Sequence, residues 1–246
     1  MTPSLVFLHG GGLAGRQWDG VRARLPDVQT FAPDLPGHGA RVRERLTLEG
    51  AARTVLDLLD GAGVPAAHLI SNSLGGTVAL HLAQTRPNRV RSLLLTGTTG
   101  TLSPFEGKLM LLSARLPLPR GPLLAAALRQ FRIPPGDRGW VREALAAWLG
   151  PGAQADLTHA LLSLPAPRPL PLPALLLAGE RETRFARLGA LRLADRLGGV
   201  PALLVPGAGH VWNLEDPELF ARTVRAWVTE TALPGELRAP HPRFPG

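Results

Sequence analysis

The strongest chemical signal in the sequence is the segment Ser71-Asn72-Ser73-Leu74-Gly75-Gly76. It follows a short apolar run and opens a helical pattern that begins at Leu74. A serine with small residues two positions before and after it can occupy a strained strand-to-helix turn, which exposes its hydroxyl at the edge of a sheet. We therefore interpret Ser73 as a nucleophile on such a nucleophile elbow, with Ser71 in place of the first glycine of the usual G-x-S-x-G pattern.

A second segment, His9-Gly10-Gly11-Gly12, follows the first apolar run. Glycines at the end of a strand let backbone N–H groups point into a cleft, because no side chain stands in the way. We expect the N–H groups of Gly11 and Leu74 to form an oxyanion hole, helped by the positive end of the helix that starts at Leu74. We interpret His9 itself as structural.

A base and a carboxylate follow later in the chain. His210 stands in a glycine-rich loop after the last apolar run, and we predict that it is the general base. A carboxylate is needed to orient the imidazole and to stabilise its charged form. Glu180 and Glu182 both follow the penultimate apolar run. We favour Glu182, and Glu180 is the alternative.

These residues require elements that present them at one edge of a sheet. Six apolar runs, each too short for a helix, end near Gly, Pro, Asp or Asn, which is typical of strands buried on both faces of a parallel sheet. The predicted strands are 5–8, 28–31, 68–70, 92–95, 174–177 and 202–205. The predicted helices are 48–59, 74–85, 188–197 and about 217–231, the last with Asp216 as N-cap. The sequence thus predicts a doubly wound α/β fold.

The alternation is interrupted between Thr99 and Pro173, where only helical patterns occur. They span about 106–116, 123–131, 140–149 and 153–164. Five prolines within residues 165–173 then predict a stiff, extended return to the next strand. We interpret residues 1–99 and 174–232 as the α/β core, 100–173 as an inserted helical cap, and 233–246 as a flexible tail.

The composition limits the function further. A chain of 246 residues with 45% hydrophobic and 19% charged residues is typical of a packed globular domain. The chain has no cysteine, which excludes disulfides, thiolate nucleophiles and thiolate metal sites. No histidine–carboxylate spacing indicates a metal site, and the predicted chemistry requires no cofactor.

The charge and the hydropathy pattern bear on partners and location. The net charge is +8, but the one lysine and 26 arginines are scattered, so we expect no nucleic-acid partner. No apolar run approaches the ~20 residues that span a bilayer, and the start of the chain does not resemble a signal peptide. We expect a cytoplasmic protein without a membrane partner that acts on a small-molecule substrate.

The motifs together resemble the α/β-hydrolase superfamily from Leu5 to about Thr231. The segment Asp34-Leu-Pro-Gly-His38-Gly39 is similar to the D-x-P-G-x-G loop of that superfamily, and we interpret it as structural. The antiparallel hairpin that usually opens the fold is expected to be missing, which leaves about six parallel strands. The resemblance implies a serine esterase with a catalytic triad of Ser73, His210 and Glu182, acting through an acyl-enzyme on a small carboxylic ester or related carbonyl compound.

Two alternative functions stay open. The stretch from Gly179 to Ala186 is similar to that of the menaquinone-pathway synthases, which eliminate pyruvate to form 2-succinyl-6-hydroxy-2,4-cyclohexadiene-1-carboxylate. That family binds a polyanionic substrate and typically has arginine where this chain has Thr77. Pyruvate elimination or carbon–carbon cleavage is the first alternative, and a non-catalytic ligand-binding protein is the second. Eight basic residues within 101–170 either serve an anionic substrate or form a solvated face: Lys108, Arg115, Arg120, Arg129, Arg132, Arg138, Arg142 and Arg168.

Overall fold

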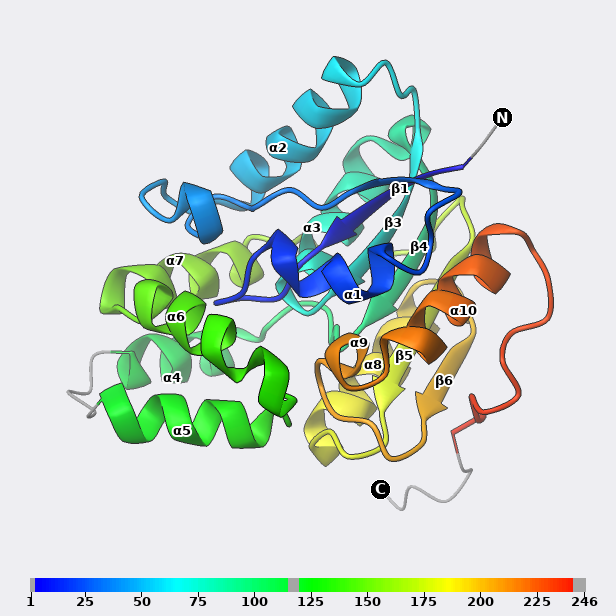
Figure 1. Ribbon diagram of the computed structural model, residues 1–246. Helices are drawn as coiled ribbons and strands as arrows, with labels where there is room; N and C mark the ends of the chain where they lie inside the picture. Colours follow the sequence, from blue (N-terminus) through cyan, green and yellow to red (C-terminus); the bar gives the residue numbers. More distant parts are fainter. Residues whose placement is uncertain (1–2, 115–119, 241–246) are drawn as a thin grey trace.

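The computed structural model describes residues 3–114 and 120–240. Six strands form one parallel sheet in the order β2-β1-β3-β4-β5-β6 (Figure 1). They are β1 (Ser4–Leu8), β2 (Gln29–Phe31), β3 (Ala67–Asn72), β4 (Val90–Thr96), β5 (Ala174–Gly179) and β6 (Ala202–Val205). Every predicted strand is present and every pairing between the strands is parallel, which confirms the predicted α/β class.

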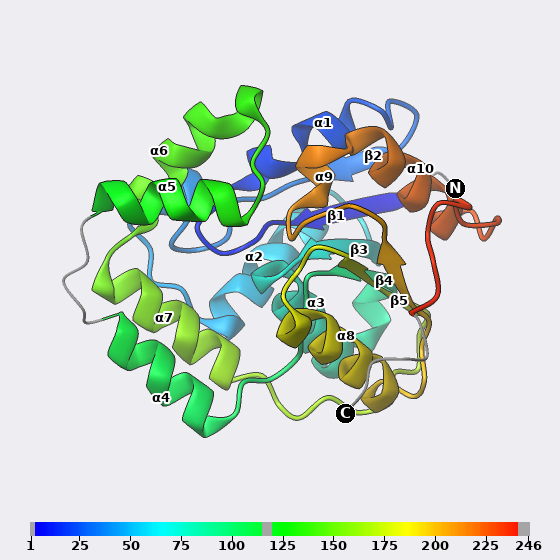
Figure 2. The same ribbon diagram turned by 90° about the horizontal axis from the view of Figure 1, so that it is seen from below.

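Helices cover both faces of the sheet, as Figure 2 shows. Successive side chains of a strand point to opposite faces, so Val6 and Leu8 join one apolar cluster while Leu5 and Phe7 join another. The first cluster lies under α2 (Leu48–Gly61), α3 (Leu74–Thr85) and α8 (Arg184–Arg196). The second lies under α1 (Asp19–Arg22), α9 (Trp212–Glu215) and α10 (Pro217–Val228). Burial of both faces explains the apolar runs of β1 and β5, in which every residue is buried.

Side-chain caps set the starts of α8 and α10. The Asp216 carboxylate accepts a hydrogen bond of 2.8 Å from the N–H of Leu219 at the start of α10, which confirms the predicted cap. The Thr183 hydroxyl accepts one from Ala186 and starts α8 four residues earlier than the sequence predicted. Short 3-10 turns complete the core: η1 (Gly15–Trp18), η2 (Gly39–Arg41) and η3 (Pro87–Arg89).

Within residues 3–114 and 120–240, no helix is long and apolar enough to cross a membrane.

Among the described residues, four helices and a 3-10 turn lie between β4 and β5. They are α4 (Pro104–Ser113), α5 (Arg120–Gln130), η4 (Pro135–Asp137), α6 (Arg138–Trp148) and α7 (Pro151–Leu162), and we call them the helical insertion. It forms a separate layer beside the sheet (Figures 1 and 2), in which α4 packs on α7 and α5 on α6. Residues 115–119 of the predicted cap lie outside the described residues.

The chain beyond α10 returns to the outer edge of the sheet. Arg238 and Leu204 exchange two backbone hydrogen bonds of 2.8 and 3.0 Å as an antiparallel bridge. Leu233 and Leu237 pack beside the second apolar cluster. Residues 233–240 of the segment interpreted as a flexible tail are therefore attached to β6, and residues 241–246 lie outside the described part.

Candidate active site

Ser73 occupies the turn between β3 and α3 in a strained backbone conformation. Its φ of 51° and ψ of −110° lie in a region that residues with a side chain rarely adopt, at a cost of about 1–3 kcal/mol. The turn is fixed by a 2.9 Å hydrogen bond from the N–H of Ser73 to the carbonyl of Thr96. The helix can lie close to the sheet because a Cβ at Gly75 would overlap the carbonyl of Leu8. The turn therefore has the strained, close-packed conformation that a nucleophile elbow requires, and the role of Ser73 as a nucleophile stays a prediction.

His210 and Glu182 meet beyond the ends of β6 and β5. The Nδ1 atom of His210 lies 2.7 Å from Oε2 of Glu182, and Oε1 of Glu182 accepts a 2.9 Å hydrogen bond from the N–H of Gly179. The Glu182 carboxylate is buried. Glu180, the alternative, instead accepts a hydrogen bond of 2.8 Å from the N–H of Gly207. The structure therefore brings Glu182 to His210, and the imidazole donates through Nδ1, which leaves Nε2 as its acceptor.

Two residues that the sequence analysis missed lie against the His210 ring. Gly97 follows β4 with a φ of 59°, and a Cβ built there would lie 2.6 Å from Cε1 of His210 and 3.1 Å from Nδ2 of Asn72. The Phe131 ring centroid lies 5.5 Å from that of the imidazole. A glycine directly after a buried strand was the available signal for Gly97. No local pattern points to Phe131, which comes from the helical insertion.

Glu215 holds the loop before His210 through the backbone N–H of Gly209. One oxygen of Glu215 accepts a 2.7 Å hydrogen bond from the N–H of Gly209, and the other lies 2.9 Å from Nε of Arg132. Arg132 belongs to the helical insertion and Glu215 to α9. This ion pair therefore connects the insertion to the loop that carries His210.

The amides predicted for the oxyanion hole differ from neighbouring amides that donate within the protein. The N–H of Gly10 donates to Gln17, and the N–H of Gly75 donates to the carbonyl of His9. Within residues 3–114 and 120–240, the N–H groups of Gly11 and Leu74 have no protein acceptor. Both residues line the cavity described below. These two N–H groups are therefore available to a ligand.

His9 is buried and fixed as a neutral imidazole. Its Nδ1 donates to the carbonyl of Gly10 at 2.9 Å, and its Nε2 accepts from the N–H of Leu35 at 3.0 Å. Burial, together with the nearby His38, lowers the pKa of His9 from its usual 6.5 to about 3. With both ring nitrogens engaged by the backbone, His9 has the structural place that the sequence analysis expected.

The loop that begins at Asp34 is held by hydrogen bonds to the Asp34 carboxylate and contacts the helical insertion through His38. The two oxygens of Asp34 accept hydrogen bonds of 2.7 Å from the N–H groups of Gly15 and Ala40. Next along the loop, the buried His38 ring stacks on Trp148 of the helical insertion, with centroids 5.9 Å apart. Burial lowers the pKa of His38, so this ring also stays neutral where the insertion meets the core.

A cavity of about 340 Å³ lies between the sheet and the helical insertion. Its lining is Gly10, Gly11, Leu13, Asn72, Ser73, Leu74, Met110, Leu123, Ala127, Phe131, Leu145, Trp148, Leu149, Gln154, Leu157, Thr158, Leu161, His210 and Val211. Among the described residues, no arginine, lysine, aspartate or glutamate lines it. Ser73 and His210 therefore share one largely apolar chamber.

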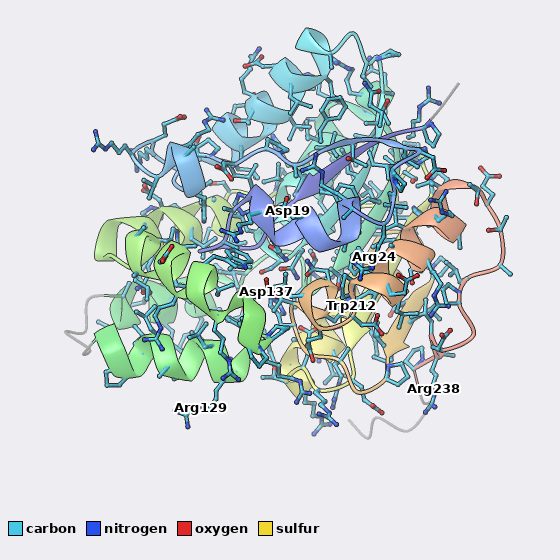
Figure 3. The ribbon with its side chains drawn as sticks, viewed as in Figure 1. Asp19, Arg24, Arg129, Asp137, Trp212 and Arg238 are labelled. Atoms are coloured by element: carbon cyan, nitrogen blue, oxygen red, sulfur yellow. The ribbon has the colours of Figure 1, made fainter. Side chains whose placement is uncertain are left out.

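The basic residues of 101–170 turn away from this chamber. All six whose side chains are described are exposed: Lys108, Arg129, Arg132, Arg138, Arg142 and Arg168. Figure 3 shows Arg129 pointing outward from α5. Arg115 and the side chain of Arg120 lie outside the described residues. The described members are therefore exposed at the surface and do not line the cavity. The described residues also include no group of three His, Asp or Glu side chains that could hold a metal ion.

Comparisons with known proteins agree with this architecture. The model of the alpha/beta hydrolase family matches residues 5–223. The chain is 26% identical to a putative carbamate hydrolase RutD of Pseudomonas syringae, covering 93% of this chain and 94% of the relative. It is 29% identical to a 2-succinyl-6-hydroxy-2,4-cyclohexadiene-1-carboxylate synthase of Yersinia pestis, covering 94% and 89%. The enol-lactonase of Burkholderia xenovorans superposes with a TM-score of 0.79 at 22% identity, covering 93% and 92%. The predicted fold is confirmed, and the chain belongs to the alpha/beta hydrolase family.

Proposed function

We propose that this protein is a serine hydrolase for small, uncharged carboxylic esters or related carbonyl compounds with an apolar acyl group. The observation that carries the proposal is the apolar cavity that Ser73 and His210 share without a charged neighbour in its described lining. Burying an apolar group there is favourable by roughly 25 cal/mol per Å². Burying a carboxylate without a cationic partner would be costly.

The first chemical step forms an acyl-enzyme. Nε2 of His210 accepts the proton of the Ser73 hydroxyl while Oγ attacks the carbonyl carbon. The resulting imidazolium is stabilised by Glu182, whose carboxylate already accepts from Nδ1. His210 then returns the proton to the leaving alcohol. In the second step, His210 removes a proton from water as the water oxygen attacks the acyl carbon. His210 then returns this proton to Oγ of Ser73 as the bond between Ser73 and the acyl group breaks, which releases the carboxylic acid.

The negative charge of each tetrahedral intermediate falls on the carbonyl oxygen. The free N–H groups of Gly11 and Leu74 are the proposed donors to that oxygen. Each donor is expected to contribute on the order of 3 kcal/mol to transition-state stability. We further propose that the helical insertion acts as a cap, since most of the apolar cavity wall comes from it.

Pyruvate elimination is the second candidate, and the relationship to the Yersinia pestis synthase favours it. The product named for that relative carries carboxylate groups, which require cationic partners in a binding site. The cavity presents none among its described lining, and Thr77 is a buried, uncharged residue of α3. Ester hydrolysis therefore fits this cavity better.

The deciding experiment compares p-nitrophenyl esters of C2 to C10 acids with the synthase precursor. We expect turnover of the esters, covalent labelling by a fluorophosphonate, and loss of both in Ser73→Ala with kcat reduced by about 10⁴–10⁶. Ser163→Ala changes an exposed hydroxyl in the insertion and is the matched control. Turnover of the precursor alone would establish elimination. Tight ligand binding without turnover or labelling would establish a non-catalytic protein.

A further inference from the structure

A chain of buried carboxamides connects the three loops of the candidate site. The N–H of Gly10 donates to Oε1 of Gln17 at 2.9 Å. Nε2 of Gln17 donates to Oδ1 of Asn72 at 3.1 Å and to Oδ1 of Asn213 at 3.0 Å. Nδ2 of Asn72 donates to the backbone carbonyl of His210 at 2.9 Å. The chain of contacts thus runs from the glycine loop through the elbow to the histidine loop.

The orientation of each carboxamide in this network is determined. Oε1 of Gln17 must accept, because its partner is a backbone N–H, so Nε2 must donate. Asn72 consequently accepts through Oδ1 and donates through Nδ2. Asn213 accepts through Oδ1 and donates through Nδ2 to the backbone carbonyl of Gln17 at 2.8 Å. Every donor and acceptor fits one arrangement only, so the network specifies a single relative position of the loops.

Burial makes this arrangement costly to break. Gln17 and Asn72 are 0% exposed and Asn213 is 1% exposed. A buried polar group that loses its partner is penalised by its full desolvation, whereas a satisfied network in a low dielectric is rigid. The space beside Gly10 is also filled, since a Cβ there would lie 2.6 Å from Oδ1 of Asn72.

We infer that Gln17 is a positioning residue for catalysis, which acts with Asn72 and Asn213. It holds the Gly11 amide, the Ser73 hydroxyl and the His210 imidazole in the relative positions that acyl transfer requires. The inference rests on the proposed function. Gln17 does not line the cavity, so its side chain acts through the loops and not on the substrate. A misplacement of about 1 Å in such a site can lower the rate by about 100-fold.

The test uses Gln17→Met, which keeps the side-chain length but removes every hydrogen bond of the carboxamide. We expect kcat for a p-nitrophenyl ester to fall about 10- to 100-fold, with KM changed less than about threefold. The rate of fluorophosphonate labelling of Ser73 should fall with kcat. Asn213→Leu, which interrupts the same network at a residue that does not line the cavity, should show the same pattern. If the network acts as a unit, the double variant should lose little more than either single variant.

Thr223→Val is the matched control for lost stability. Its hydroxyl is fully buried, donates to the carbonyl of Leu219 in α10, and lies away from the cavity. This variant should lower Tm but leave kcat within about twofold. A Gln17→Met or Asn213→Leu enzyme that is folded at the assay temperature and keeps its kcat within about twofold would overturn the inference. If Gln17→Met does not fold, Asn213→Leu decides in the same way, because Asn213 also lies outside the cavity lining.

The wild-type enzyme separates this inference from the proposed function. If wild-type Ser73 reacts with the fluorophosphonate and the Gln17→Met variant reacts as fast, the positioning role is wrong and the hydrolase proposal stands. If wild-type Ser73 neither reacts nor supports ester turnover, the hydrolase proposal is wrong, and the positioning role that depends on it is wrong too.

Discussion

The His210 imidazole donates a hydrogen bond of 2.7 Å to the buried carboxylate of Glu182, 28 residues earlier in the chain. The other oxygen of that carboxylate is held by the backbone N–H of Gly179 at the end of β5. The imidazole is thereby fixed as the tautomer that carries its proton on Nδ1. This tautomer leaves Nε2 able to accept a proton, which is the property that a general base for Ser73 needs.

Removing the charge of Glu182 should therefore affect catalysis more than binding. Glu182→Gln keeps the size of the side chain, but its amide nitrogen can take the place of the carboxylate oxygen that accepts from Nδ1 of His210. The His210 tautomer with its proton on Nδ1 is then no longer favoured. We expect kcat to fall by about 10³–10⁴, with a smaller change in KM. Glu180→Gln is the matched control and should keep kcat within about threefold, because Glu180 contacts the Gly207 amide and not His210. Equal losses in the two variants would contradict the assignment.

Gly97 provides a steric test of the His210 position. Gly97→Ala would place a Cβ within 2.6 Å of the imidazole and should displace the ring, so we expect kcat to fall at least about 100-fold. Gly63→Ala is matched in backbone strain, since its φ is 64°, but nothing lies within 4 Å of a Cβ there. Both variants should lose stability, and steady-state kinetics should show that only Gly97→Ala loses activity. Unchanged kinetics in Gly97→Ala would show that the close approach of Gly97 does not position the imidazole.

The strained backbone of Ser73 leads to a prediction about stability. Glycine tolerates positive φ without the penalty that a side chain brings, so Ser73→Gly should be more stable than Ser73→Ala by about 1 kcal/mol. Both variants should lack activity. Urea unfolding of the two inactive proteins measures the difference directly, and the prediction fails if the alanine variant is equally or more stable.

The apolar cavity leads to a prediction about chain-length preference. Leu161 of α7 lines it, so Leu161→Trp should reduce the space for the acyl group. We expect kcat/KM to shift toward shorter p-nitrophenyl esters, with the longest acyl chains losing about 10-fold or more, as expected for the loss of one or two buried methylenes. The exposed His159 on the same helix gives the control variant His159→Trp, which should keep the original preference. A shift of equal size in the control would indicate an effect unrelated to the cavity.

The buried His9 makes the stability depend on pH in a defined direction. Its folded-state pKa of about 3 lies below the usual 6.5, so between these values the unfolded chain binds a proton that the folded protein does not. The contribution of His9 to stability is therefore complete above pH 6.5 and decreases as the pH falls toward 3, by up to about 1.4 kcal/mol per pH unit. Urea unfolding from pH 7.5 to 4.5 should show this loss. NMR of the ring nitrogens, assigned with His9→Gln, should show a neutral ring throughout, and titration near pH 6.5 would contradict the prediction.

The sequence alone was sufficient for much of the fold. Both ends of α3, Leu74 and Thr85, agree with the predicted span, because the strained serine before it and the apolar periodicity within it are local signals. The strands β1 and β5 are equally local, since burial on both faces leaves an apolar run in each. The cap of α10 by Asp216 needs only neighbouring residues. Such features are encoded within a few residues of where they act.

Contacts between distant segments were decided only by the tertiary structure. The sequence favoured Glu182 over Glu180 but could not decide between them, and the folding of the β5 and β6 loops placed Glu182 beside His210. Two partners of the Gln17 side chain, Asn72 and Asn213, lie 55 and 196 residues away, so no spacing predicts these hydrogen bonds. The outward direction of the basic residues in the insertion likewise depends on which helix faces are buried. Local patterns determine the elements and the candidate residues, but the packing of those elements determines which side chains meet.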